Sequence, residues 1–547
     1  MDVPVELLRV ALSDLPIEIA QESGKCVVNV VICGKSIKLS VELPEAFPYV
    51  FPVISIADES ADIVRGIPHR NLNKTLCLFD QETTIPNFKK PVELIEASLR
   101  KAVDILESGL LNKNREDFID EFLAYWDRTS ELNCISNVSY GNKAMRLKAG
   151  YGGDKAFYVS FSDERCFGLA ATRIRNLKEI PIAECLYIPL REPCDCLEAK
   201  TQQQWADIMR RSSDYYREYA SFLQTRRHDG NLIIFSQPYK GSLILSGFLH
   251  NHLHNSAGFR PGKTRLGVAM QGEDGKKDVI PIRIIDISQK RLYERGGVGN
   301  ISMGERFGIV GCGSLGSHVA EMLTNCGCTN FSFYDNQMLG AENIARHTCG
   351  FSQIDMPKTE ALKQNLFQHN PNLDIKTSNE NIHHVLEHDI ASLNANDFLI
   401  LTVANAPIEY RFAKMLLENR ISRPVIIMWV EPYAMAGHAL VLNKPQDVFS
   451  ELFSEELLFC ESIVENGASL YKREAGCQAT YMPYSGLDIK SFATAFVRAL
   501  IGGTFERNKN YHFRWIGALS QAERYGIKIS SAAQGLQEFT SYVERID

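Results

Sequence analysis

The sequence predicts a multidomain chain of α+β and α/β folds. Its 547 residues suffice for three or four domains of roughly 150 residues each. The N-terminal region has the order helix, strands, loop, helix, which is typical of a compact α+β domain, and from residue 306 strands alternate with helices, which indicates a parallel sheet. We therefore expect domains over 1–135, 136–290 and 291–547.

The composition is that of ordinary folded domains, with 45% hydrophobic and 23% charged residues. A net charge of -7 argues against a nucleic-acid-binding protein that relies on overall charge. The first residues carry Asp2 and Glu6 and lack the apolar core of a signal peptide, and no apolar run approaches the roughly 18 residues that span a bilayer. We expect a cytoplasmic protein without membrane contact, whose fourteen cysteines are reduced.

The N-terminal region begins with leucines at helical spacing over 5–15, and Pro16 follows. A proline-rich corner and a later amphipathic helix complete the α+β pattern. The predicted elements are strands at 26–33, 36–41 and 53–56, the corner at 47–52, and the helix at 91–108.

The middle region, 140–300, is the least informative and predicts a folded middle α+β domain. Strand-like stretches occur at 232–236 and 243–245, and one polar helix is expected over 201–224. The alternating histidines His250, His252 and His254 resemble a metal site, but no acidic or cysteine ligand lies within a few residues. We therefore predict no metal site there.

From residue 306 the pattern predicts a parallel, doubly wound sheet. The expected elements alternate along the chain: strands at 307–310, 330–335, 397–403 and 424–430, with helices to about 325, at 357–369 and at about 407–419.

The first turn of this region carries Gly311, Gly313 and Gly316 in a Gly-x-Gly-x-x-Gly motif between a strand and a helix. Such glycines allow a tight turn and close approach of the backbone to phosphate, and the helix N-terminus offers free N–H groups to an anion. Asp335 ends the second strand, where a carboxylate can accept hydrogen bonds from a ribose. The motif alone predicts a nucleotide site, and a nicotinamide oxidoreductase is one interpretation.

Two cations follow the second strand and favour a different nucleotide. Arg346 lies in Asn343-Ile344-Ala345-Arg346-His347, and Lys358 begins the next predicted helix. A triphosphate and its departing pyrophosphate require such charges, whereas a dehydrogenase has no evident need for them.

The stretches GCGSLG, YDNQMLGAENIARH and MPKTEALKQNL together resemble the adenylating domain of ubiquitin-activating enzymes (E1) and their bacterial ThiF/MoeB-like relatives, over about 290–510. The resemblance implies a Rossmann-like fold, ATP with Mg²⁺, and a homodimer. It also assigns roles: the glycine loop and Asp335 hold ATP, Asn343, Arg346 and Lys358 contact its phosphates, and Arg295 reaches the ATP of the dimer partner.

The chain departs from that family at two points. Asn405 stands where the family usually has an aspartate that handles magnesium, and an amide is a weaker ligand for a hard cation. Glu409 is the candidate substitute. The structural zinc cysteines of many relatives are absent.

The stretch Cys477-Gln478-Ala479-Thr480-Tyr481-Met482-Pro483 resembles the crossover-loop cysteine of activating enzymes, Cys-x-x-Thr-x-x-Pro. A thiolate attacks an acyl-adenylate readily, and Arg473 and a nearby helix start favour the thiolate. Cys460 is the alternative, although its surroundings resemble a packed helix.

A second cysteine, Cys77, lies beyond the N-terminal strands in the stretch from His69 to Asp80. By itself Leu76-Cys77-Leu78 is typical of a buried strand. In this order it resembles a ubiquitin-conjugating (E2) domain over about 1–130, which implies that Cys77 accepts the acyl group and that Asn71 stabilises the oxyanion. Arg70 replaces the usual proline, and the interval between Asn71 and Cys77 is two residues shorter.

A conjugating domain fused ahead of an activating domain resembles the E1–E2 fusion enzymes of bacterial CBASS antiphage operons. That resemblance implies a donor, which is the C-terminus of a cGAS/DncV-like nucleotidyltransferase or of a ubiquitin-like protein. It also implies an acceptor, which is a lysine or other amine of a target.

The expected reaction has four steps: acyl-adenylate formation, thioester formation on Cys477, transfer to Cys77, and amide formation. Three alternatives remain open. A MoeB-type sulfur-carrier adenylyltransferase would not need Cys77, a nicotinamide oxidoreductase would bind NAD in place of ATP, and a catalytically inactive scaffold would only bind a partner's tail.

Overall fold

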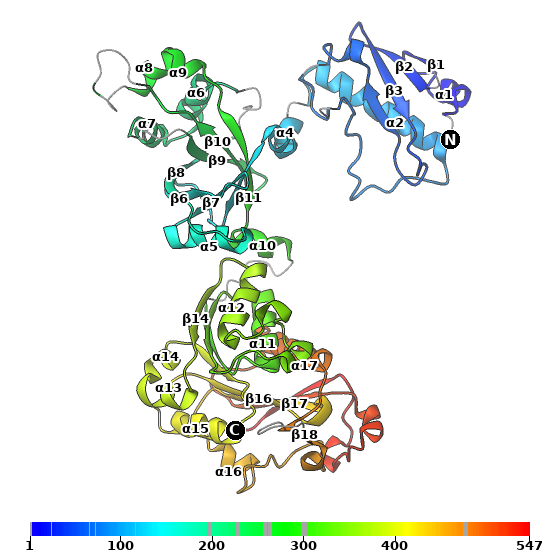
Figure 1. Ribbon diagram of the computed structural model, residues 1–547. Helices are drawn as coiled ribbons and strands as arrows, with labels where there is room; N and C mark the ends of the chain where they lie inside the picture. Colours follow the sequence, from blue (N-terminus) through cyan, green and yellow to red (C-terminus); the bar gives the residue numbers. More distant parts are fainter. Residues whose placement is uncertain are drawn as a thin grey trace. The chain divides into compact units, whose positions relative to one another are not determined.

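The computed structural model describes residues 3–22, 25–64, 66–71, 73–114, 116–193, 199–225, 230–254, 260, 265–296, 304–473 and 480–547 (Figure 1). These residues form two compact units. One contains 1–135, 140–167 and 178–285, and the other contains 136–139, 168–177 and 286–547. Within the described helices, no segment is both long enough and apolar enough to cross a bilayer.

The N-terminal part is a four-stranded antiparallel sheet covered by one long helix. Its elements are α1 (Val5–Ala11), β1 (Ile17–Glu22), β2 (Lys25–Ile32), β3 (Lys35–Glu42), β4 (Val53–Ile56) and α2 (Pro91–Leu110), with the strands in sequence order. Helix α2 begins with Pro91, and Leu99 and Leu106 on its inner face are fully buried in the same core as Leu39 and Ile54.

The three expected strands are present, but the sheet has one more, β1. Within β1 the apolar residues Ile17 and Ile19 alternate with the charged residue Glu18, and Ile19 is buried. So short an alternation directly after Pro16 gives a weak strand signal, because it contains only two strongly apolar residues.

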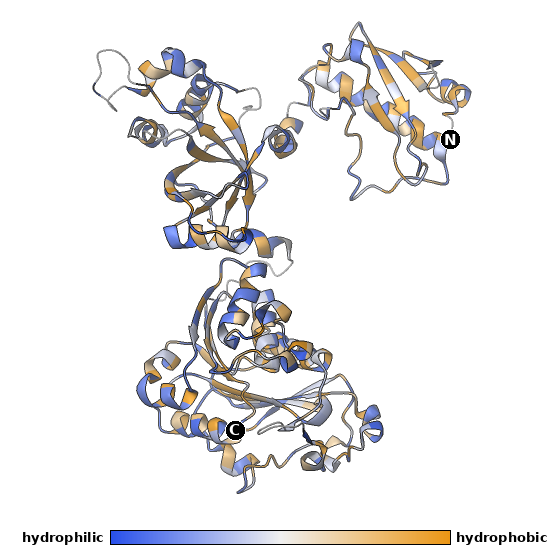
Figure 2. Ribbon diagram, viewed as in Figure 1, coloured by the Kyte–Doolittle hydropathy of each residue, from blue (hydrophilic) through white to orange (hydrophobic). Residues whose placement is uncertain are grey.

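The middle part is a closed seven-stranded β-barrel, in the spatial order β10-β11-β5-β7-β6-β8-β9. The strands are β5 (Leu132–Ser136), β6 (Met145–Tyr151), β7 (Ala156–Ser160), β8 (Ile182–Pro189), β9 (Asn231–Tyr239), β10 (Ser242–His250) and β11 (Ile280–Asp286). The accompanying helices are α5 (Asp163–Arg173), α6 (Gln202–Ser212), α7 (Tyr216–Thr225), α8 (Leu266–Gln271) and α9 (Glu273–Lys276). Figure 2 shows hydrophobic residues along the barrel strands.

The single helix expected over 201–224 is instead two helices, α6 and α7. The break lies at Ser213, whose backbone is extended and whose hydroxyl donates to the carbonyl of Pro189 at 2.9 Å. A serine that bonds to a neighbouring backbone carbonyl competes with helix continuation, and this hydrogen bond is not visible in helical periodicity.

Two short helices, α3 (Asp117–Asp120) and α4 (Phe122–Thr129), connect α2 to the barrel. Helix α4 is fixed to the barrel by its aromatic side chains. Phe122 and Trp126 are buried in one core with Trp205 and Phe235, and the indole N–H of Trp126 donates to the carbonyl of Ile282 at 3.0 Å. The helix that follows the N-terminal fold is therefore part of the barrel's hydrophobic core.

The second unit is built on an eight-stranded sheet. Its strand order is β14 (Asp374–Ser378), β13 (Asn330–Tyr334), β12 (Arg306–Val310), β15 (Phe398–Leu401), β16 (Val425–Val430), β17 (Ala436–Leu442), β20 (Tyr511–Ile516) and β21 (Ser541–Arg545). The first five strands are parallel and the last three are antiparallel. The main helices are α11 (Ser314–Asn325), α12 (Lys358–His369), α15 (Ala406–Leu417) and α17 (Gly486–Ile501).

These elements confirm the predicted α/β and α+β class, including the strand–helix alternation from residue 306. The pattern did not predict β14 or the antiparallel strands β17, β20 and β21. Strand β14 is a polar edge strand in which only Ile375 is buried. In β20, His512 and Arg514 interrupt the apolar residues because they belong to a polar network within the sheet.

Removing the Trp126 side chain should destabilise the first unit, since the ring contacts Trp205 and Phe235 with centroids 5.6 Å from each. We expect Trp126→Ala to lower its free energy of unfolding by about 3–5 kcal/mol, and Trp126→Phe to cost less because most of the ring volume remains. Urea titration followed by hydrogen exchange of peptides from each unit measures this change. Equal loss of protection in β12–β13 would contradict the assignment of Trp126 to the barrel core.

Candidate active sites

The predicted glycine loop is a tight turn between β12 and α11. Gly311 has φ +94°, a conformation that favours glycine, and a Cβ added to Gly316 would lie 2.0 Å from the carbonyl oxygen of Gly311. A Cβ on Gly313 would meet no protein atom within 4 Å, so the loop is open on that side. The first N–H groups of α11 have no partners within the helix, which makes this turn suited to an anion.

Asp335 follows β13 and faces this loop. Its Oδ2 accepts a hydrogen bond from the Cys312 backbone N–H at 2.8 Å, and its Oδ1 accepts one from the Gln337 N–H at 2.8 Å. The carboxylate is therefore held beside the glycine turn at the carboxyl ends of two neighbouring parallel strands, which is where open α/β sheets bind ligands.

Lys358 is brought to the same edge by the start of α12. Its side chain is 7% exposed, and Nζ donates to Gln337 Oε1 at 2.7 Å. The hydrogen-bond partner of this nearly buried side chain is a neutral amide and not a carboxylate, so Nζ is placed to bind an anionic ligand.

His347, to which the sequence assigned no role, connects the same parts. Its Nε2 donates to the carbonyl of Cys312 at 2.7 Å, and its Nδ1 accepts from the Cys349 N–H at 3.0 Å. Burial, together with the nearby charge of Lys358, lowers the pKa of His347 to about 4, so this imidazole is neutral at pH 7. Its only sequence signal was its position next to Arg346.

Asn343 and Arg346 lie in a short 3₁₀ segment, η2 (Ala341–Arg346), next to the loop. The carbonyl of Arg346 accepts a hydrogen bond from the hydroxyl of Ser314, the first residue of α11. The Arg346 guanidinium lies 4.9 Å from the ring centroid of Tyr484, and the amide oxygen of Asn343 accepts from the Gly340 N–H at 3.0 Å.

The structure thus gathers the glycine loop, Asp335, Lys358, Arg346 and Asn343 around one edge of the sheet. Cys477 lies outside the described residues, as does the side chain of Arg295. The chain on both sides of the cysteine segment is described. β18 (Lys472–Arg473) pairs with β19 (Thr480–Tyr481), and a Cβ on Gly486 would lie 3.0 Å from the carbonyl oxygen of Ala345.

Asn405 has a structural task in this chain. Its side-chain oxygen accepts from the Ile408 N–H at 3.2 Å and so caps α15. The carboxylate of Glu409 accepts from the Asn405 backbone N–H at 3.1 Å, and burial raises the pKa of Glu409 to about 7. The buried carboxylate of Glu409 therefore lies next to Asn405.

The second cysteine site is a hairpin-like loop in the N-terminal part. The Cys77 N–H donates to the carbonyl of His69 at 2.8 Å, and the Asn71 N–H donates to the carbonyl of Thr75 at 2.8 Å. The two arms of the loop are therefore antiparallel, with Cys77 opposite His69. The Cys77 side chain is exposed, so interpreting Leu76-Cys77-Leu78 as a buried strand is wrong for the cysteine.

His69 carries the largest electrostatic perturbation near this cysteine. Its Nδ1 lies 2.7 Å from Glu121 Oε1, and its Nε2 lies 3.0 Å from Asp117 Oδ2. Hydrogen bonds with the Cys77 side chain and with Glu121 raise the pKa of His69 to about 10, against the opposing effect of burial. No sequence signal linked His69 to residues some fifty positions later.

The amide of Asn71 is engaged on both sides. Its Nδ2 donates to Thr75 Oγ1 at 2.9 Å, and its Oδ1 accepts from Arg128 Nη1 at 2.6 Å. These contacts fix the side chain, and one amide hydrogen remains beyond the bond to Thr75. The oxyanion role of Asn71 stays a prediction.

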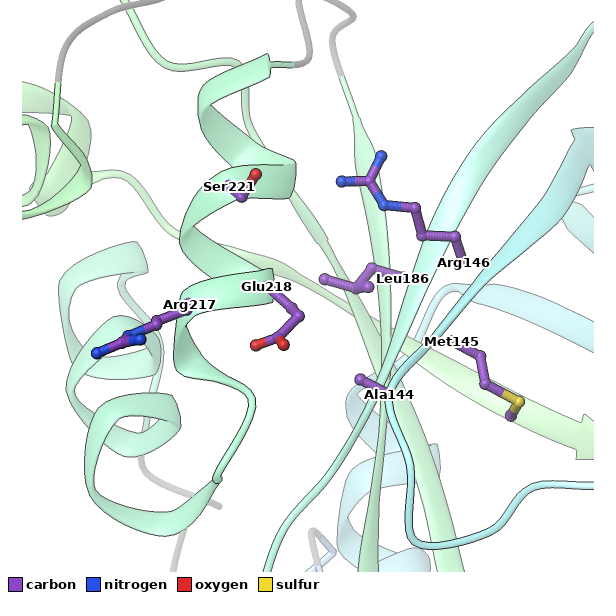
Figure 3. A pocket seen from close by; sticks show the side chains of 7 residues that line it. All are labelled: Ala144, Met145, Arg146, Leu186, Arg217, Glu218 and Ser221. Atoms are coloured by element: carbon purple, nitrogen blue, oxygen red, sulfur yellow. The ribbon is translucent and has the colours of Figure 1, made fainter.

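Two further polar features lie away from both sites. Among the described side chains, the group with metal-ligand spacing is Glu461, His512 and Glu544, but Arg514 pairs with Glu461 at 2.5 Å. A pocket of about 320 Å³ lies between α7 and strands β6 and β8 (Figure 3). Glu218 extends from α7 toward the strands, whereas Arg217 extends away, and the pocket contains none of the predicted site residues.

The alternating histidines of the middle region do not act as one set. His250 is buried in β10, where its Nδ1 lies 2.8 Å from the carbonyl of Asn251, and burial lowers its pKa to about 4. His254 instead pairs with Asp274, at 2.8 Å.

Comparison with family models gives two matches. Residues 295–486 match the ThiF family, and residues 17–135 match prokaryotic E2 family B. The first range contains the glycine loop, Asp335 and Lys358, and the second contains His69, Asn71 and Cys77.

Two curated relatives match the chain over most of their length. The chain is 21% identical to the ATP-dependent ubiquitin transferase-like protein Cap2 of Pseudomonas aeruginosa, over 76% of this chain and 75% of that protein. It is 22% identical to Cap2 of Vibrio cholerae, over 82% of each chain. A stretch of 191 residues is 27% identical to ubiquitin-like modifier-activating enzyme 5 of Drosophila pseudoobscura pseudoobscura, over 33% of this chain and 46% of that protein.

An activating-type domain and a conjugating-type domain therefore occur in one chain. Ubiquitin-like activation and conjugation, with use of ATP, follow from that combination. The chain is therefore an E1–E2 fusion with a ThiF domain and a prokaryotic E2 domain, an ATP-dependent ubiquitin-like activating and conjugating transferase, and it is similar to the fusion enzymes of bacterial CBASS operons.

Proposed function

We propose that this enzyme passes a protein C-terminus through an adenylate and two thioesters. A C-terminal carboxylate attacks the α-phosphate of ATP, which releases pyrophosphate and forms an acyl-adenylate. The Cys477 thiolate displaces AMP, the Cys77 thiolate takes the acyl group from Cys477, and a lysine or other amine of the target takes it from Cys77 as an amide. The observation that carries the proposal is the presence on one chain of an open glycine loop beside Asp335 and Lys358 and of an exposed Cys77 beside His69.

At the adenylation site, each residue has a task that its placement supports. Gly311, Gly313 and Gly316 allow the phosphates to approach the backbone, and Asp335 accepts hydrogen bonds from the ribose. Lys358, Arg346 and Asn343 contact the phosphates and offset the charge that develops on pyrophosphate. In a homodimer, Arg295 of one subunit reaches the ATP of the other.

Magnesium would neutralise phosphate charge here, and the buried carboxylate of Glu409 is the oxygen ligand that fits it. Asn405 is better assigned to capping α15 than to binding a cation, since its side-chain oxygen already accepts the Ile408 N–H.

The donor that we propose is the C-terminus of a cGAS/DncV-like nucleotidyltransferase, which conjugation would prime for antiphage signalling; a ubiquitin-like protein is the alternative donor. Asn71 would donate to the oxyanion formed when the amine attacks the Cys77 thioester. We place the enzyme in the cytoplasm, where the thiols of Cys77 and Cys477 remain reduced.

One observation favours a second candidate, an inactive scaffold that binds the donor's tail. Both Asn405 and Asn71, which stand at catalytic positions of relatives, are engaged in structural hydrogen bonds. A MoeB-type sulfur-carrier adenylyltransferase is disfavoured because Cys77 is exposed beside a charged histidine, which such an enzyme would not need.

Two glycine substitutions separate nucleotide binding from folding. Gly313→Ala adds a methyl group that meets no protein atom, so we expect an unchanged melting temperature but ATP binding weakened at least about tenfold, because the methyl group enters the space of the phosphates. Gly316→Ala places the methyl group 2.0 Å from a backbone oxygen and should destabilise the second unit. Calorimetric titration with ATP and thermal melting measure both effects. Unchanged ATP affinity in a folded Gly313→Ala protein would argue against this loop as the nucleotide site.

The order of the two cysteines can be tested with the full chain, ATP, magnesium and the candidate donor. We expect an ATP-dependent, thiol-sensitive adduct that persists in Cys77→Ala and disappears in Cys477→Ala, as seen by intact mass and non-reducing gels. Cys460→Ala is the control and should behave as the wild type, although Cys460 is also exposed. ATP turnover to AMP with full product formation in Cys77→Ala would support the sulfur-carrier alternative, and ATP binding without any adduct would support the scaffold.

The magnesium role of Glu409 predicts a pH-dependent metal requirement. Because the pKa of Glu409 is raised to about 7, its carboxylate binds a proton as pH falls below 7, and magnesium must then displace that proton. We expect the magnesium concentration for half-maximal ATP–pyrophosphate exchange to rise between pH 8 and 6 and to be higher and less pH-dependent in Glu409→Gln. Glu418→Gln, at the other end of α15, is the control. An unchanged magnesium requirement in Glu409→Gln would exclude this ligand.

A further inference from the structure

The imidazole of His69 lies between two carboxylates that come from outside its own loop. Nδ1 lies 2.7 Å from Glu121 Oε1, and Nε2 lies 3.0 Å from Asp117 Oδ2. An ionised carboxylate can only accept hydrogen bonds, so each ring nitrogen must carry a proton to satisfy its partner. The contacts therefore require the charged imidazolium form of His69.

This cation is adjacent to the sulfur of Cys77. The two residues are opposite each other across the loop, joined by the backbone hydrogen bond from the Cys77 N–H to the His69 carbonyl at 2.8 Å, and interaction with the Cys77 side chain contributes to the raised pKa of His69. His69 adopts φ 65°, a backbone conformation that L residues rarely adopt, and its own N–H is held by Glu121 Oε2 at 2.9 Å. The loop therefore holds His69 in a strained backbone conformation, and this conformation accompanies the placement of the ring beside the cysteine.

Glu121 is in turn fixed by the fold. Its Oε2 also accepts a hydrogen bond from the Tyr125 hydroxyl at 2.8 Å, and its neighbour Phe122 is buried in the barrel core. Burial opposes ionisation of this carboxyl, but the bonds from His69 and Tyr125 hold its pKa below the usual range. The carboxylate that orients His69 is therefore positioned by a helix of the barrel.

We propose that His69 is a catalytic residue of the conjugating site, whose imidazolium charge stabilises the negative charge on the Cys77 sulfur, with Glu121 and Asp117 as positioning residues. The step that it assists rests on the proposed function, whereas its effect on the reactivity of the Cys77 thiol does not.

The same charge serves both reactions of the sulfur. In the transfer to Cys77, the thiolate forms a new carbon–sulfur bond, and the electron pair of the broken bond leaves with the Cys477 sulfur. In the conjugation step, the amine nitrogen forms the amide bond and loses its proton to solvent, and the electron pair of the carbon–sulfur bond returns to Cys77. In each case anionic sulfur at Cys77 is next to His69 at the start or at the end of the step.

The pH range over which His69 stays charged depends on the ionisable groups that face this loop. They are Asp117 and Glu121 on the His69 ring, Tyr125 on Glu121, Arg128 on Asn71, and Arg70, whose guanidinium donates to the carbonyl of Ala61. The His69 pKa is about 10, so the cation persists through the physiological range and is lost only as pH rises through about 10. His69 therefore cannot act as the general base that deprotonates the amine at neutral pH.

The first test needs neither ATP nor a donor. The full chain is treated with iodoacetamide at pH 6.5, and the alkylation rates of Cys77 and Cys33 are measured by peptide mass spectrometry. Cys33 is the internal reference because it is an exposed thiol in the same sheet domain, at the turn between β2 and β3. We expect the rate ratio of Cys77 to Cys33 to fall about tenfold in His69→Gln, which keeps a hydrogen-bond donor but loses the charge.

Substitutions on the helices supply a matched pair. Glu121→Gln should lower the ratio about threefold, since the ring loses its orienting charge, whereas Glu116→Gln, an identical change at an exposed position of the same segment, should leave it unchanged. Cys33 alkylation and thermal melting monitor folding of each variant. An unchanged ratio in folded His69→Gln and Glu121→Gln proteins would overturn the proposal.

A second measurement connects the residue to turnover. With the Cys77 thioester loaded, discharge to a lysine-containing acceptor should show a lower maximal rate in His69→Gln with little change in the acceptor concentration for half-maximal rate. A wild type that forms no thioester but shows the predicted alkylation ratios would refute the proposed relay and retain the role of His69. A relay that proceeds normally in His69→Gln would refute the role of His69 alone.

Discussion

The close approach of the first turn of α11 to the carbonyl of Gly311 is the constraint on which the adenylation site depends. Only a glycine fits at position 316, because a Cβ there would lie 2.0 Å from the carbonyl oxygen of Gly311, and this fit lets the N-terminus of α11 lie beside the end of β12. Asp335 can then bind the N–H of Cys312, His347 can bind its carbonyl, and Ser314 can hold η2. These hydrogen bonds fix the segments next to the turn, and the cationic side chains of the adenylation site come from those segments.

The conjugating site depends on a different kind of constraint, namely contacts between distant parts of the sequence. His69 is charged because Glu121 and Asp117 meet its two ring nitrogens, and Asn71 is fixed because Arg128 meets its amide oxygen. Asp117 lies on α3, Glu121 lies between α3 and α4, and Arg128 lies on α4, and α4 is seated in the barrel core through Phe122 and Trp126. The electrostatics of Cys77 are therefore a property of the first unit as a whole.

This difference explains what the sequence could predict. The glycine motif, Asp335 and Lys358 were identifiable because a strand, a turn and a helix follow one another within a few dozen residues, and the strand–helix alternation was equally local. The seven-stranded barrel was not predictable, because its closure pairs β10 with β11 and β8 with β9, whose separations in sequence vary widely. The sequence motif around Cys77 includes His69, but the charge of His69 depends on its contact with Glu121. Hydrophobic periodicity does not predict that contact. Asn405 was identified as a departure, whereas its capping of α15 follows from hydrogen bonds that only the structure defines.

The burial of Trp126 also limits how such enzymes can be recombined in evolution or in the laboratory. A conjugating module cut off before the barrel would carry the aromatic face of α4 into water, where Phe122 and Trp126 would favour aggregation. If this module were grafted onto another activating enzyme, the recipient would have to supply an apolar surface in place of Trp205 and Phe235. It would also have to supply a hydrogen-bond acceptor in place of the Ile282 carbonyl. The conjugating module and the barrel should therefore be moved together in any such graft.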